Sequence, residues 1–365
     1  MPLLDWFIYP SSGYAGPNPM DYVSILVAGL LSFVIAIEIL PPLIRKMREG
    51  GMVGHDVNKP GRPVVAELGG IAAVFAFSLS ISLMIGLRKL LIPGSDPTLE
   101  PPYLAAIAVF FIAAMIGLID DISNIKQRIK ALAVLFAALP LLLVHFRDGS
   151  LLSTHVVVQY LPFGATLDLS WMYFGYWLVL VPIGVTGVAN AMNMSAGYNG
   201  LESGQIGVVS LSLLSVTLVL GASEVSAVVF AAIAGAGFAL MYFNRYPARV
   251  FVGDIGTLGL GAAIAAGVIL GGIEIYGLVA IIPAFYEAGA TFYYGVVRAT
   301  PGRREACHNP VIDAQGRLSP PKGAERYTLA YYILSRRPMT EPRLVATLLS
   351  LYGACGIAAL VLSAL

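Results

Sequence analysis

Asn190–Gln205 reads Asn-Ala-Met-Asn-Met-Ser-Ala-Gly-Tyr-Asn-Gly-Leu-Glu-Ser-Gly-Gln, a polar run without Lys or Arg between two apolar segments. The apolar segments predict helices that cross a membrane, and the polar run predicts the loop that joins them. Asn offers a neutral oxygen to a hard cation and paired donor and acceptor groups to a base edge, while Gly lets the backbone approach a ligand. We therefore interpret this run as part of a binding site. The alternative is a flexible turn at a helix end, where Asn and Gly also occur.

The composition of the whole chain supports a membrane protein. Of the 365 residues, 58% are hydrophobic and 12% are charged, whereas soluble domains have about 25% charged residues. Apolar runs of about 17 to 25 residues can cross a bilayer as helices, and we count about ten. We expect an all-α polytopic membrane protein that forms a single integral membrane domain over residues 1–365. The runs lie near 22–44, 68–92, 103–119, 131–146, 173–190, 205–220, 224–243, 256–274, 276–297 and 343–365.

The basic residues are distributed unevenly among the loops that ten crossings create. All but three of the 22 Lys and Arg residues fall on one side, and the exceptions are Arg88, Lys89 and Arg147. Because cytoplasmic loops carry an excess of Lys and Arg, the basic side is predicted to face the cytoplasm. We therefore expect a multi-pass protein of the cell membrane, with both termini outside. The Asn-rich loop and a large loop over 298–342 would then face the cytoplasm.

A second polar segment on the same side follows the third apolar run, with Asp120-Asp121, Asn124 and Lys130. Two adjacent carboxylates at the edge of a hydrocarbon slab are costly unless a cation or a base compensates them. If the helix continues, Asp120 and Asn124 share a face, so acid, amide and ammonium groups can be presented together. The alternative is a charged helix end that only anchors the span.

Two further polar segments precede apolar runs on this side. His-Asp-Val-Asn-Lys at 55–59 is followed by Glu67, and Phe251-Val-Gly-Asp254 precedes the eighth run. Asp254 can reach a metal ion, although Asp is also a preferred helix N-cap residue. Glu67 can be a favourable charge at a helix N-terminus or a hydrogen-bond acceptor for a ligand. Phe251, taken alone, is more typical of a core or lipid-facing position.

The remaining loops differ in what they predict. Residues 155–169 alternate in polarity and are interrupted by Pro-Phe-Gly, which predicts a short β-hairpin on the outer surface. The 298–342 loop contains Arg303, Arg304 and His308. It is either a positive-inside anchor or a site for a polyphosphate, because Arg pairs with phosphate oxygens in a forked geometry. The two Cys and four His are scattered, which excludes a Cys- or His-rich metal cluster.

Taken together, these loops resemble those of the polyprenyl-phosphate N-acetylhexosamine-1-phosphate transferases, of the glycosyltransferase 4 type. Within that family the chain is most similar to the dolichyl-phosphate N-acetylglucosamine-1-phosphotransferases. Bacterial members typically have Asp-Gly-(Leu/Met/Phe)-Asp-Gly where this chain has Ala-Gly-Tyr-Asn-Gly at 196–200. Eukaryotic members have a last loop resembling Arg-His-Arg-Ile-Pro, where Ala-Cys-His-Asn-Pro stands at 306–310. A eukaryotic-like core with a divergent loop fits an archaeal homologue.

The resemblance implies transfer of N-acetylhexosamine-1-phosphate from a UDP-sugar to a polyprenyl (dolichyl) phosphate, with release of UMP. N-acetylglucosamine is the expected sugar, and Mg²⁺ or Mn²⁺ is the expected cofactor. The reaction would be the first membrane step of lipid-linked glycan assembly, as in protein glycosylation. We expect no nucleic-acid partner, and a homodimer is left open. The alternatives are a bacterial-type undecaprenyl-phosphate sugar-1-phosphate transferase and, from another class, an ion-coupled membrane transporter.

The resemblance also implies roles for individual residues. The expected metal ligands are Asn193 and Asp254, and the expected catalytic residues are Asp120, Asp121, Lys130 and Asp254. For Asp120 we favour orientation and electrostatics over proton abstraction, because the second pKa of a phosphate is near 6. These roles require the four loops to converge. The expected substrate-binding residues are Val57, Glu67, Asn124, Asn190, Gly197, Asn199, Phe251, Arg303, Arg304 and His308.

Overall fold

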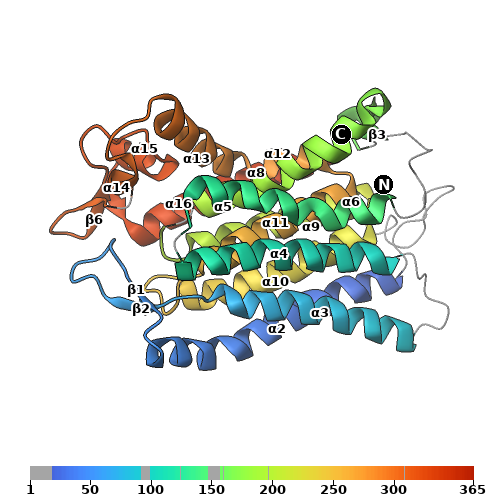
Figure 1. The fold of residues 1–365 in the computed structure, drawn as a ribbon, viewed down its shortest axis with the longest axis horizontal. Helices are drawn as coiled ribbons and strands as arrows, with labels where there is room; N and C mark the ends of the chain where they lie inside the picture. Colours follow the sequence, from blue (N-terminus) through green and yellow to red (C-terminus); the bar gives the residue numbers. More distant parts are fainter. Residues whose placement is uncertain are drawn as a thin grey trace, which may run out of the picture.

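The computed structural model describes residues 19–91, 99–123, 125–146, 157–158, 160–195, 197–307 and 309–365. Long helices run side by side along a common direction, and the small elements near β1, α14 and α15 gather at one end (Figure 1). Two residues that the sequence predicts in the site, Asn124 and His308, lie outside the described residues.

Eight helices in the described ranges are long and apolar enough to cross a membrane, which agrees with a polytopic membrane protein. Another pair of helices is bent by 74° and could count as a ninth span. The pair consists of α12 (Glu274–Ala280) and α13 (Ile282–Phe292), the latter continued by η7 (Tyr293–Val297). The eight are α2 (Pro19–Glu49), α3 (Gly70–Leu91), α4 (Glu100–Ser123), the run Ser170–Met194 that ends in α8 (Val181–Met194), α9 (Leu201–Leu220), α10 (Glu224–Asn244), α11 (Gly253–Gly271) and α16 (Glu341–Ser363).

The predicted span at 131–146 is helical but is not one continuous α-helix. It is divided among α5 (Gln127–Ala133), the 3-10 helix η2 (Val134–Ala138) and α6 (Leu139–Phe146). Pro140 falls in the first turn of α6, where the lack of an N–H donor is tolerated at a helix start but not in an interior. The predicted number of ten crossings therefore stays a prediction.

Within the described residues, three small antiparallel sheets accompany the helices, whereas the sequence predicts one short β-hairpin. β1 (Val53–His55) pairs with β2 (Val64–Ala66). β3 (Val157–Val158) pairs with β4 (Leu167–Asp168) within the predicted hairpin, whose external location stays a prediction.

The 298–342 segment is folded rather than a plain loop. It holds α14 (Arg303–Cys307), α15 (Leu329–Arg336) and a sheet of β5 (Val311–Ile312), β6 (Arg317–Ser319) and β7 (Met339–Thr340).

The most enclosed helices are α10 and α11, whose apolar windows are 83% and 78% buried, against 33–56% for the other single spans. Close packing depends on small residues, because lipid provides little hydrophobic drive for helices to associate. A Cβ atom on Gly235 of α10 would overlap the backbone carbonyl of Gly29 in α2. The loop that joins these two central helices, residues 245–252, therefore lies near the centre of one end of the bundle.

Candidate active site

A chain of four polar side chains joins the ends of α4, α5, α8 and α11. The Lys130 ammonium lies 2.7 Å from Oδ2 of Asp120 and 2.5 Å from Oδ2 of Asp254. The other oxygen of Asp254 accepts a hydrogen bond of 2.7 Å from Nδ2 of Asn193. The structure thus brings together residues that lie up to 134 positions apart in the sequence, as the resemblance requires.

Lys130 is 4% exposed and stays charged in this setting. Burial alone would lower its pKa, but the charges and hydrogen bonds of Asp254 and Asp120 outweigh burial and raise the pKa above its ordinary value. The ammonium therefore remains protonated throughout the physiological pH range. It supplies one fixed positive charge between two carboxylates.

Asp121, next to Asp120 in α4, has a different role in the structure. Its Oδ1 accepts the N–H of Asp254 at 2.9 Å, and its Oδ2 accepts the N–H of Ile255 at 3.0 Å. These are N–H groups of the first turn of α11, which have no partner within their own helix. Asp121 therefore caps α11 from a neighbouring helix, and the Asp254 side chain is left to face Lys130 and Asn193. The predicted catalytic role of Asp121 stays a prediction, since in the structure its two oxygens are occupied by these N–H groups.

A cavity of about 290 Å³ opens beside this chain of polar residues. Five of the predicted site residues line it, and these are Val57, Gly197, Asn199, Phe251 and Asp254. Tyr198, Glu202 and Glu287 add to the wall, and burial raises the pKa of the Tyr198 phenol well above its ordinary value. The cavity is therefore lined by carboxylates such as Asp254 and by aromatic, aliphatic and amide groups at Phe251, Val57 and Asn199.

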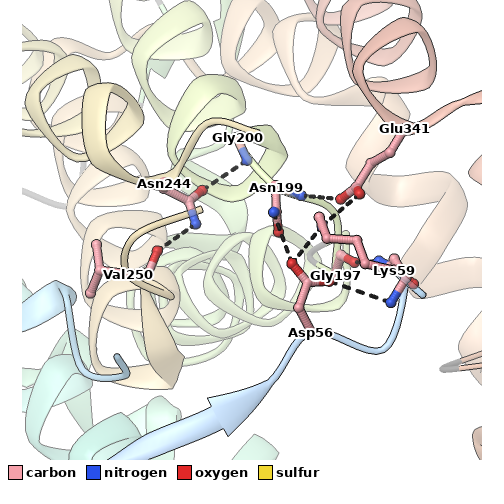
Figure 2. A network of polar contacts seen from close by, with 9 residues as sticks. Asp56, Lys59, Gly197, Asn199, Gly200, Asn244, Val250 and Glu341 are labelled. Carbon is pink, nitrogen blue, oxygen red and sulfur yellow. Dashed lines mark hydrogen bonds and ion pairs between the residues drawn. The ribbon is translucent and has the colours of Figure 1, made fainter. Parts of the chain in front are cut away.

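The loop of residues 197–200 is held by buried side chains rather than left flexible. Oδ1 of Asn244 accepts the N–H of Gly200 at 3.0 Å, and Nδ2 of Asn244 donates to the carbonyl of Val250 at 2.9 Å (Figure 2). The Glu202 carboxylate accepts the N–H of Gly197 at 3.2 Å and also that of Val252. Gly197 and Gly200 have φ of +114° and +91°, a region that side-chain-bearing residues rarely adopt. The flexible-turn alternative does not fit these contacts.

The other four described residues of the predicted substrate-binding set do not line the cavity. Glu67 packs its carboxylate against Gly54, and Asn190 donates to the carbonyl of Thr186 within α8 at 2.9 Å. Arg303 donates to Thr291 and to the carbonyl of Tyr327, each at 3.1 Å, so it braces the folded 298–342 segment. Arg304 lies with Arg303 at a separate open depression of about 630 Å³.

Asn193, Asp254 and Thr257 gather oxygen-bearing side chains at one place. Nδ2 of Asn193 donates to Asp254 at 2.7 Å and to Oγ1 of Thr257 at 2.8 Å, and turning this amide over would present its oxygen there. Carboxylate, amide and hydroxyl oxygens suit Mg²⁺, which is usually held by few protein ligands together with water and substrate phosphates. Within the described ranges no group of three His, Cys, Asp or Glu side chains could hold a metal ion. The set therefore fits a magnesium site only with oxygens from a substrate.

Sequence reasoning missed several residues of the site. Glu202 belongs to the Asn-rich motif, which by itself indicates no role for it, yet its carboxylate accepts N–H groups from two loops. Thr257 lies one helical turn after Asp254 and was also missed. Asn58 belongs to the His-Asp-Val-Asn-Lys motif at 55–59, but the motif indicates no individual role for it. By sequence, Glu341 is only an acidic residue at a helix start.

Comparisons with known proteins agree with the family resemblance of the sequence. The family model described as glycosyl transferase family 4 matches residues 103–272. A Saccharolobus solfataricus protein, provisionally named UDP-N-acetylglucosamine dolichyl-phosphate N-acetylglucosaminephosphotransferase, is 32% identical over 251 residues, 68% of this chain and 71% of the relative. The Saccharomyces cerevisiae protein of that name is 29% identical over 289 residues, 69% of this chain and 62% of the relative. A phospho-N-acetylmuramoyl-pentapeptide-transferase of Hydrogenobaculum sp. is 28% identical over 277 residues, with coverage of 68% and 72%.

Proposed function

The chain belongs to glycosyl transferase family 4, and on this premise we propose that it transfers N-acetylglucosamine-1-phosphate from UDP-N-acetylglucosamine to dolichyl phosphate or a related polyprenyl phosphate. The names of the archaeal and yeast relatives support this donor and this acceptor. The observation that carries the proposal is the buried Lys130 ammonium, held between Asp120 and Asp254 beside a cavity. A donor that carries two phosphates needs such fixed positive charge.

The proposed reaction joins two anions. An oxygen of the polyprenyl phosphate forms a bond to the phosphorus that carries the sugar, and the bond from that phosphorus to the bridging oxygen breaks. UMP leaves with the bridging oxygen and the electron pair. The second pKa of a phosphate is near 6, so the attacking group is already largely ionised at neutral pH. The main task for the protein is therefore to position both phosphates and offset their repulsion.

The residues divide this work according to their contacts. Lys130 would pair with phosphate oxygens, and Asp120 would hold Lys130 in place through the 2.7 Å ion pair. Asp254 and Asn193 would hold Mg²⁺ or Mn²⁺, which supplies positive charge at the diphosphate when bound. Asp121 would keep Asp254 in position by capping α11. The part of the cavity wall that contains Phe251 and Asn199 would bind the uridine.

We further propose that the protein lies in the cell membrane and that its site faces the cytoplasm. Asn199 of the cavity wall contacts Asp56 in the β1–β2 connection, which also carries Lys59 (Figure 2). Gly200 lies against Arg245 in the α10–α11 connection, which also carries Arg249. The site is therefore at the end of the bundle that carries these basic loops. Cytoplasmic loops are enriched in Lys and Arg, so this end of the bundle is expected to face the cytoplasm. Cysteines introduced at the exposed Lys126 and Trp171, near opposite ends of the bundle, test the orientation. An impermeant thiol reagent applied to intact cells is expected to label the Trp171 site only.

The reaction itself is tested by incubating the detergent-purified chain with UDP-N-acetylglucosamine, a polyprenyl phosphate and Mg²⁺. We expect UMP release and a lipid product whose mass has increased by one N-acetylhexosamine phosphate. UDP-N-acetylmuramoyl-pentapeptide serves as the competing donor, because a relative named for the pentapeptide reaction also matches. Turnover of that donor alone, or of neither donor, would contradict the proposal.

Gly117→Ala is expected to lower kcat in this assay by about 10²-fold, the loss that a shift of about 1 Å produces in a positioned site. A Cβ atom at Gly117 of α4 would overlap the carbonyl of Asp254 and the N–H of Ile255, so it would push α11 away. The matched control is Gly86→Ala in α3, where a Cβ atom meets nothing within 4 Å. Gly86→Ala should leave kcat unchanged. Equal activity of both variants would mean that the α4–α11 contact does not set the site.

A further inference from the structure

Three buried charged side chains form a cluster at the edge of the cavity, outside the Asp120–Asn193 chain of polar residues. Nζ of Lys59 lies 2.5 Å from Oδ2 of Asp56 and 2.7 Å from Oε2 of Glu341 (Figure 2). Their side chains are only 8%, 2% and 3% exposed, respectively. Lys59 and Asp56 lie in the connection between β1 and β2, and Glu341 is in the first turn of α16. The cluster therefore joins the first loop of the bundle to its last helix.

This cluster reaches the cavity wall through Asn199. Oε1 of Glu341 accepts the backbone N–H of Asn199 at 2.7 Å, and Nδ2 of Asn199 donates to Asp56 at 2.9 Å (Figure 2). Nearby, Nδ2 of Asn58 donates to the carbonyl of Gly197 at 2.6 Å. Asp56, Asn58, Gly197 and Asn199 all line the cavity. The ion pair thus fixes two loops of the wall against each other.

Stability alone does not account for this arrangement. Buried ion pairs are often no more stable than apolar side chains of similar volume, because desolvation offsets the attraction between the charges. Here one ammonium faces two carboxylates, so one negative charge must be satisfied by other donors. The N–H and amide of Asn199 and the positive end of α16 provide them. The arrangement instead specifies one geometry for Asn199 and for the loop that contains Asp56.

We propose that the Lys59–Glu341 ion pair acts as a latch, by which we mean that it holds one part of the cavity wall in a fixed position. This part consists of Asp56, Asn58, Gly197 and Asn199 and would bind the uridine. Lys59 and Glu341 act through Asn199 and Asp56, so they are positioning residues rather than catalytic residues. The wall that they restrain offers amide and backbone groups, which match the donor and acceptor edges of a base. This inference rests on the proposed function, because it assigns the wall to the UDP-sugar. The lipid phosphate, whose expected contacts lie near Lys130, should be unaffected by the latch.

Glu341→Gln and Lys59→Met test the latch. Each is expected to raise the KM for UDP-N-acetylglucosamine about tenfold, the effect of losing one charged hydrogen bond, with the KM for polyprenyl phosphate unchanged and kcat changed less than threefold. The Kd for UDP-N-acetylglucosamine, measured by titration calorimetry, should rise by the same factor. Glu341→Asp keeps the charge on a shorter side chain and should recover part of the affinity. If Glu341→Gln does not fold, Glu341→Asp and Lys59→Arg carry the same test with smaller expected increases.

Glu224→Gln is the matched control, because Glu224 is also an acid in the first turn of a spanning helix and pairs with a part-buried base, Arg88. It lies at the opposite end of α10 from Asn244. This variant should lower the unfolding temperature without changing either KM. The latch is overturned if the Lys59 and Glu341 variants also lose only thermal stability, or if both KM values rise together. If the wild type binds the nucleotide sugar without releasing UMP, the proposed reaction fails, yet the Kd comparison still decides the latch.

Discussion

Asp254→Asn is expected to lower kcat by about 10³-fold or more, with the protein still folded. Removing one preorganised group that stabilises transition-state charge costs about 10²–10³ in kcat. Asp254 contacts Lys130 and Asn193 and would also hold the proposed metal ion. The amide keeps the shape of the side chain but removes its negative charge. We also expect the Mg²⁺ concentration for half-maximal activity to rise. UMP release measured across a Mg²⁺ titration checks both effects.

Asp121→Asn is the comparison that separates chemistry from capping. Its oxygens accept only backbone N–H groups of α11, and an amide can still satisfy one of these two donors. We therefore expect about tenfold loss of kcat, a lower unfolding temperature and an unchanged Mg²⁺ requirement, as for a weakened helix cap. If Asp254→Asn retained a tenth of wild-type activity, or if Asp121→Asn lost as much as Asp254→Asn, the division of roles between these acids would be wrong.

The different roles of Asp120 and Asp121 show what the sequence could not supply. The adjacent acids were predictable as a site feature, because carboxylates at a membrane edge need compensation. Successive residues on an α-helix point about 100° apart, so Asp120 meets Lys130 while Asp121 meets the start of α11. Which acid faces which neighbour depends on how α4 packs against α11. Packing at Gly117 sets that rotation, and no local pattern encodes it.

Asp254 is a related case, in which both interpretations were open from sequence. Asp at a helix start favours an N-cap, and the same residue can bind a metal ion. The structure gives the capping function to Asp121 from another helix, so the Asp254 carboxylate is available to Lys130 and Asn193. Spans such as α10 and α11 were predictable because lipid demands long apolar runs. The interrupted helix over 127–146 and the folded 298–342 segment were not, since short elements give weak patterns.

The contacts of Glu341 and Arg303 could not be predicted from the residues one at a time. Glu341 lies 282 positions from Lys59 and is an ordinary first-turn acid by sequence. Its contacts with Lys59 and Asn199 exist because the first turn of α16 lies beside the β1–β2 connection. Arg303 has the chemistry to bind phosphate, but its side chain instead donates to Thr291 of α13 and to the carbonyl of Tyr327. Side-chain chemistry indicated what each residue could do, and tertiary packing decided between the options.

Lys130→Met should be about as damaging to kcat as Asp254→Asn, with a loss of about 10³-fold, and should also destabilise the protein. Removing the ammonium leaves the buried Asp120 and the part-buried Asp254 without their cation, and breaking a buried pair costs about 3–5 kcal/mol. Lys126→Met is the matched control, because Lys126 lies four residues earlier and is exposed. It should alter neither kcat nor the unfolding temperature in detergent.

A double variant separates the two consequences of losing Lys130. Asp120→Asn combined with Lys130→Met removes one of the stranded carboxylates, so the unfolding temperature should recover relative to Lys130→Met alone. The kcat should stay low, because the positive charge offered to the phosphates is still absent. Recovery of kcat together with the unfolding temperature would mean that Lys130 only holds the two acids in place and makes no contact with the reacting phosphates.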